Sequence, residues 1–84
     1  MSNNRFDYLI PAIKLMRKGE SHVDSFRKIS KDFGVTYQTV SAQCTRHLGI
    51  PTNVFVDLVK NHKITEFLIK QFPNEQAFII EKLS

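Results

Sequence analysis

A short stretch around a glycine, from Gly34 to Ser41, constrains the fold of this chain more than any other part of its sequence. It reads Gly-Val-Thr-Tyr-Gln-Thr-Val-Ser and directly follows an amphipathic segment, Val23 to Phe33. Glycine readily adopts the left-handed conformation that ends many helices, and a threonine hydroxyl can cap the backbone of a following helix. The pattern therefore predicts a helix, a tight turn at Gly34 and a second helix capped by Thr36.

The segment before the turn has the periodicity of one helix face. Its apolar residues recur at steps of three and four, which predicts that they share an inward side: Val23, Phe26, Ile29 and Phe33. Ser21 and Asp24 fit a capping pair at its start, with the carboxylate near the positive end of the helix. We therefore expect a capped helix that packs against a core.

The second predicted helix, about 37–48, has two unlike sides, and Gly49 is expected to end it. The inward side carries Tyr37, Val40, Cys44 and Leu48. The outward side is polar, with one charge, and carries Gln38, Thr39, Ala42, Gln43 and Arg46. A solvated helix face usually mixes Glu and Lys instead. Glutamine can bond adenine, arginine can bond guanine, and alanine or threonine can contact a thymine methyl group. The outward side is thus predicted to read base edges in a DNA major groove.

The stretch from Gly34 to Ser41 resembles the turn and the start of the recognition helix in the lac repressor family. This resemblance implies that Tyr37 and Gln38 contact base edges. The chain has Ala42 where that family normally carries an arginine. The leading segment, Tyr8 to Gly19, is also similar to the first helix of winged-helix modules at the front of bacterial restriction proteins.

The charge distribution agrees with a nucleic-acid partner. Residues 1–50 hold eight Lys and Arg against four acids, whereas residues 51–84 hold four against four, so the net charge of +4 lies in the first part. The predicted phosphate contacts are Lys14, Arg27, Lys28 and Lys31. The predicted base-reading set is Thr36, Tyr37, Gln38, Thr39, Ala42, Gln43 and Arg46.

The remaining segments, 4–18 and 52–83, are predicted to form a helical scaffold. In the first of them, Pro11 either kinks the helix or marks a later start, since proline lacks the backbone donor that an inner turn requires.

The second half allows two interpretations. The favoured one is a helix capped by Thr52 and closed by Asn61, a helix over 64–72, and a last helix capped by Asn74. The alternative is a hairpin near 54–69, the wing of a winged helix, because apolar residues alternate from Val54. Leu, Lys and Glu dominate this half, which favours helices.

The chain is therefore predicted to be a single all-α domain over 1–84, a small helical bundle that contains a helix-turn-helix. The two helices of this helix-turn-helix, which would recognise DNA, span about 23–48. One cysteine suits a reducing cytoplasm, and we expect a cytoplasmic, nucleoid-associated protein without a membrane span. No catalytic, cofactor, metal-ligand or small-molecule pattern is evident, so an enzyme is not expected.

The predicted function is that of a double-stranded DNA-binding module in bacterial transcription regulation, or the targeting domain of a longer protein such as a restriction nuclease. A module with one short recognition helix is expected to work as a homodimer or with a covalently following domain. The alternative is a protein–protein interaction or dimerisation module that uses the apolar C-terminal surface. Such docking would be far less sensitive to salt than DNA binding.

Overall fold

A computed structural model describes residues 6–83, and these residues form six α-helices and two short 3-10 helices without a β-strand. The elements are, in chain order, α1 (Leu9–Arg17), α2 (His22–Phe33), α3 (Tyr37–Cys44), η1 (Arg46–Leu48), α4 (Thr52–Lys60), α5 (Ile64–Gln71), η2 (Pro73–Glu75) and α6 (Gln76–Leu83). The prediction of an all-α fold is confirmed.

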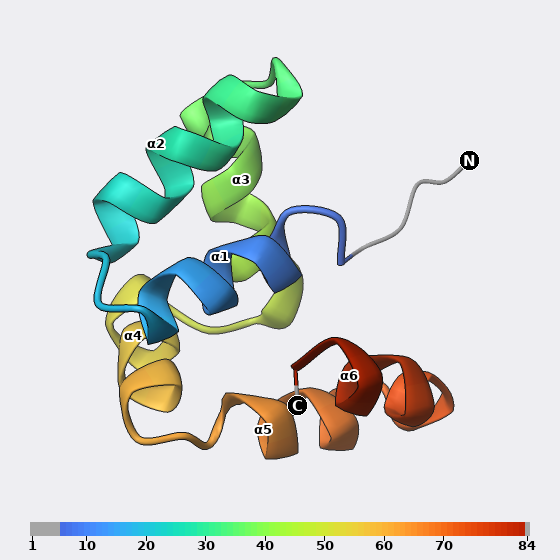
Figure 1. The fold of residues 1–84 in the computed structure, drawn as a ribbon. Coiled ribbons are helices and arrows are strands. Elements are labelled where there is room, and N and C mark those ends of the chain that lie inside the picture. The colour runs from blue at the N-terminus through green and yellow to red at the C-terminus, as the bar shows by residue number, and fades with distance from the viewer. Residues whose placement is uncertain (1–5, 84) are drawn as a thin grey trace.

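Helix α1 lies at the centre of the arrangement and contacts α2, α3, α4 and α6. Figure 1 shows it crossing the middle of the molecule, with α2 and α3 on one side and α4, α5 and α6 on the other. Its Ala12 and Ile13 are fully buried, and Phe26 of α2 packs between Tyr37 and Phe55, at ring-centroid distances of 5.8 and 6.1 Å. The hydrophobic core is thus built around α1 and the Phe26 ring.

The start of α1 resolves the two interpretations of Pro11. The helix begins at Leu9, so Pro11 lies in its first turn, where the missing N–H has no intrahelical partner to lose. The later start is therefore confirmed and the kink is not. Residues 4 and 5 of the expected helix lie outside the described residues.

The predicted caps and the glycine turn between Ser21 and Thr36 are confirmed, whereas the placement of Phe33 on the inward side is wrong, since this side chain is 51% exposed. The Ser21 hydroxyl accepts a hydrogen bond from the Asp24 N–H at 3.0 Å, and Gly34 ends α2 in the left-handed conformation, with φ of 67°. The Thr36 hydroxyl accepts from the Thr39 N–H at 3.1 Å and so caps α3. Two helices are thus joined by a short, well-defined turn.

Helix α3 is shorter than the sequence predicts. It ends at Cys44 because Thr45 leaves the helical conformation, with φ of −126° and ψ of −72°, and a separate turn of 3-10 helix follows. The Thr45 hydroxyl donates to the Ser41 carbonyl at 2.8 Å, a side-chain bond of the kind that competes with regular helix. Gly49 then ends η1 with φ of 74°, as expected.

The second half of the described chain is helical, and the alternative of a hairpin near 54–69 is wrong. The fully buried residues of this stretch lie at helical spacing, Phe55 with Val59 and Ile64 with Leu68, rather than at alternate positions. Asn61 follows α4 as predicted.

Two predicted caps in this half are also wrong. Thr52 is the first helical residue, since Pro51 occupies the cap position, and no side chain caps the helix there. Asn74 lies inside η2, which runs directly into α6, so no separate cap is formed at that residue.

Most of the apolar second half belongs to the core. Among the described residues, the exposed large hydrophobic side chains are Phe33, which is 51% exposed, and Ile80, which is 42% exposed. No helix within residues 6–83 is both long enough and apolar enough to cross a lipid bilayer.

Candidate nucleic-acid interface

A shallow, open depression of about 340 Å³ lies over the first turn of α3 and the following 3-10 helix. It is lined by Thr36, Gln38, Thr39, Ala42, Arg46 and His47. We call this surface the polar depression. Among the described residues, no acidic side chain lines it, and Arg46 carries the one permanent charge. Five of its six residues belong to the predicted base-reading set, so the structure brings most of that set together.

The first turn of α3 is held in a fixed orientation by its inward side. Val40 is fully buried, and the Tyr37 ring packs edge-on against Phe26. On the outward side, the hydroxyls of Thr36 and Thr39 lie 2.9 Å apart and bond each other. Gln38 is exposed beside this pair, so its amide can reach an incoming partner with both its donor and its acceptor.

Tyr37 does not line the polar depression. Its ring is half-buried against Phe26, at a centroid distance of 5.8 Å. This agrees with its predicted place on the inward side of the helix. A base-reading role for Tyr37, which rests on resemblance, stays a prediction.

The expectation that Gln43 lies on the outward side is wrong. Its side chain is only 7% exposed, and its Oε1 accepts hydrogen bonds from the backbone N–H groups of Tyr8 and Leu9, at 2.6 and 2.7 Å. No side chain at the Tyr8 cap position bonds the start of α1, so Gln43 satisfies donors that would otherwise be left without a partner. In the sequence, the one local indication of this role is that no residue suited to capping the helix stands directly before Leu9.

Arg46 lines the polar depression, but it lies on a different element from the one predicted. It lies on η1 rather than on a continued α3, and it lines the depression together with Ala42. His47, which is not in the predicted base-reading set, lines the depression as well. Both imidazole nitrogens can form hydrogen bonds, so His47 adds polar contact groups to this surface.

Three of the four predicted phosphate contacts lie together on α2. Arg27, Lys28 and Lys31 are exposed and border a separate shallow depression that also includes Glu20 and Asp24. The Lys28 Nζ is 3.7 Å from the Glu20 carboxylate, so its charge is partly neutralised. Arg27 and Lys31 are therefore the better candidates for contact with phosphates.

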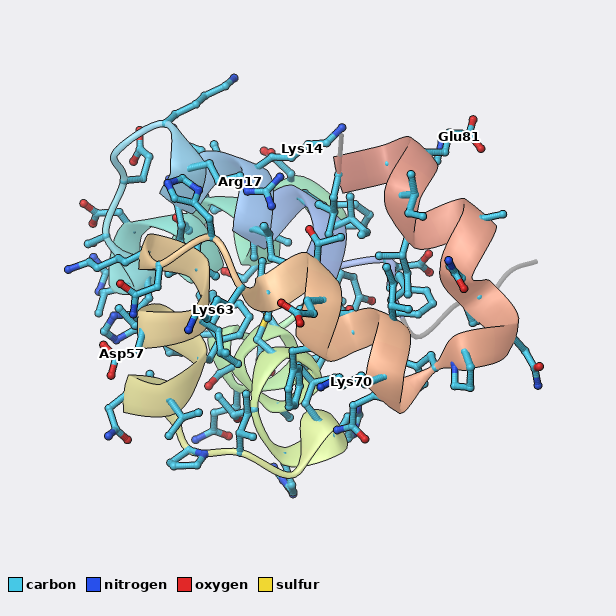
Figure 2. The ribbon with its side chains drawn as sticks, turned by 90° about the horizontal axis from the view of Figure 1, so that it is seen from below. Lys14, Arg17, Asp57, Lys63, Lys70 and Glu81 are labelled. Atoms are coloured by element: carbon cyan, nitrogen blue, oxygen red, sulfur yellow. The ribbon has the colours of Figure 1, made fainter. Side chains whose placement is uncertain are left out.

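Lys14 belongs to a different group of cations. It borders a depression with Arg17, Lys18 and Lys82, and Figure 2 shows Lys14 and Arg17 extending together from α1. The Arg17 guanidinium donates to the Leu83 carbonyl at 2.6 Å and to the Thr65 hydroxyl at 3.1 Å, so it ties α1 to α5 and α6. The structure thus does not bring Lys14 together with the α2 residues.

The chemistry of Cys44 is that of a core residue. Its side chain is fully buried, and burial raises the pKa of the thiol far above its ordinary value. No group of three or more potential metal ligands occurs in the described part of the chain.

Comparison with protein-family models, with curated proteins and with solved structures gives no match to this chain. The interpretation of the polar depression therefore rests on its own geometry and chemistry.

Proposed function

We propose that this chain is a DNA-binding module that uses α2, the Gly34 turn and α3 as a helix-turn-helix, with α3 in the major groove. The observation that carries the proposal is the polar depression. It gathers an exposed amide, two hydroxyls, a methyl group and a guanidinium at the N-terminal turn of α3 and the adjoining 3-10 helix. These are the groups that recognise base edges by hydrogen bonds and methyl contacts.

Gln38 is the principal base reader in this proposal. Its exposed amide lies on the first turn of α3, the part of a recognition helix that contacts base edges most directly. Ala42 and Thr39 offer small contact surfaces for a thymine methyl group, and Arg46 offers a bidentate donor for guanine.

Arg27 and Lys31 supply the phosphate contacts that set register. They are exposed on α2, the helix that precedes α3, and phosphate contact gives affinity that is independent of sequence and sensitive to salt. A single recognition helix contacts only a short DNA sequence, so a second copy or a following domain would supply the remaining affinity. The module would then serve in transcription regulation or in targeting a longer protein to DNA.

The first test replaces Gln38 by alanine and measures binding to a selected duplex and to random duplexes. We expect Gln38→Ala to lose about 1–3 kcal/mol of discrimination at one base pair while nonspecific binding stays nearly unchanged. Gln76→Ala, which changes an exposed glutamine on α6, is the matched control and should have no effect. Equal losses on selected and random DNA would refute the reading role of Gln38.

The second test replaces Lys31 by alanine and follows affinity against salt concentration. We expect weaker binding to every sequence. The slope of the logarithm of the binding constant against the logarithm of the salt concentration should become shallower by about 1, because one phosphate contact is lost. Lys60→Ala is the matched control, since Lys60 is exposed at the end of α4 and outside both depressions. Binding that does not weaken with salt at all would contradict the DNA-binding proposal and favour apolar docking.

A further inference from the structure

A second, more enclosed cavity of about 250 Å³ lies where the start of α1 meets η1 and the end of α5. It is lined by Phe6, Leu9, Gln43, His47, Leu48 and Phe72. We call it the aromatic cavity. Four of its six lining residues are apolar, and no carboxylate, lysine or arginine of residues 6–83 lines it.

The aromatic wall of this cavity is preformed. The rings of Phe6 and Phe72 meet edge to face, with centroids 5.4 Å apart and an interplanar angle of 87°. Leu48 beside them is held by its backbone, because the Gln71 side chain donates to the Leu48 carbonyl at 2.7 Å. A planar apolar group therefore meets a wall that needs little rearrangement to receive it.

Within the part of the chain that the structure describes, one hydrogen-bond donor of this wall has no acceptor. The Gln43 Oε1 is occupied by the N–H groups of Tyr8 and Leu9, and Nε2 forms no hydrogen bond within residues 6–83. No fully buried side-chain nitrogen or oxygen of the described residues lacks a partner, so Nε2 keeps some exposure, and Gln43 is one of the residues that line the aromatic cavity. The amide group is fixed by its two other bonds and thus presents a preoriented donor.

We propose that the aromatic cavity binds a small neutral molecule that carries one aromatic ring and a carbonyl or amide acceptor. The ring would lie against Phe6, Leu48 and Phe72, and the acceptor would bond the Gln43 Nε2 group. The volume suits one ring, because an apolar cavity of roughly 150 Å³ already holds benzene and drug-sized ligands occupy roughly 300–1,000 Å³. A charged ligand is disfavoured, since none of the described residues that line the cavity carries a fixed charge.

The test is an NMR titration of the labelled chain with two probes, benzamide and toluene. Both carry one ring, but only benzamide has the acceptor. We expect saturable shifts at Phe6, Leu48 and the Gln43 side-chain amide for benzamide, with a Kd on the order of 1 mM and about tenfold weaker binding of toluene. Shifts that stay linear up to roughly 10 mM for both probes, or equal affinities for the two, would overturn the proposal.

The variant Gln43→Glu separates the proposed donor from the structural role of this side chain. A glutamate keeps the oxygen that accepts from Tyr8 and Leu9 and removes the Nε2 donor, so the fold is expected to persist. Benzamide binding should weaken about tenfold in this variant, and toluene binding should change much less. Gln76→Glu makes the same change on the exposed side of α6 and should leave both affinities unchanged.

Equal losses of the two probes in Gln43→Glu would refute the proposed donor. Intermolecular NOEs from the benzamide ring to Phe72 in the unaltered chain give a measurement that does not depend on any variant. Their absence at saturating benzamide would place the probe outside the aromatic cavity and overturn the assignment.

Discussion

At the scale of single residues, Gln43 has the largest structural role that the sequence did not reveal. Two backbone donors at the start of α1 depend on its one oxygen, at 2.6 and 2.7 Å. We expect Gln43→Ala to lower the free energy of unfolding by about 2–3 kcal/mol, because both N–H groups lose their partner and a small cavity opens. Urea-induced unfolding followed by circular dichroism measures this loss.

Two substitutions provide the controls for this prediction. Gln43→Glu retains the acceptor and should unfold within about 1 kcal/mol of the unaltered chain. Gln38→Ala changes an exposed glutamine one and a half turns earlier in the same helix and should alter stability by less than about 0.5 kcal/mol. If Gln43→Ala and Gln38→Ala had similar stabilities, the bonds from Gln43 to α1 would contribute nothing measurable.

At the scale of elements, the turn between α2 and α3 depends on the backbone of Gly34, which has φ of 67°. A Cβ atom placed there would meet no other atom within 4 Å, so a substitution costs conformational energy without a clash. We expect Gly34→Ala to destabilise the fold by about 1–2 kcal/mol and Gly34→Asn by less, since asparagine tolerates the left-handed region. Thermal unfolding of the two variants tests this order, and an alanine variant as stable as the asparagine one would contradict it.

The elements also show which features a sequence can predict. The caps at Ser21 and Thr36 and the helix ends at Gly34 and Gly49 join residues at most a few positions apart, so local chemistry was sufficient to place them. The bond between Gln43 and Tyr8 spans 35 positions and became visible only when α1 and α3 were packed together.

The candidate site shows the same limit. Gln38, Thr39 and Ala42 could be assigned to one surface because helical periodicity alone relates them. The contribution of His47 could not, since it depends on the break at Thr45, where a side-chain bond to Ser41 accompanies the change from α-helix to 3-10 helix. Periodicity assumes a continuous helix and cannot report where one stops.

At the scale of the whole molecule, three side chains tie distant elements together. Gln43 joins α3 to α1, Arg17 joins α1 to α5 and α6, and Gln71 joins α5 to η1. The aromatic cavity lies between two of these connections, and His47 lines both this cavity and the polar depression. A molecule in the cavity therefore meets a residue that also belongs to the proposed DNA surface.

This shared residue leads to a prediction that combines the two proposals. If benzamide displaces the His47 side chain, its occupancy should change DNA affinity by a factor of about 3–10, and by linkage DNA should change benzamide affinity by the same factor. Fluorescence anisotropy of a labelled duplex with and without benzamide measures the first factor, and an NMR titration of the complex measures the second. His47→Ala should abolish the coupling, because it removes the side chain that the aromatic cavity and the polar depression share. Benzamide that binds without altering DNA affinity would show that the two surfaces act independently, although they share a wall.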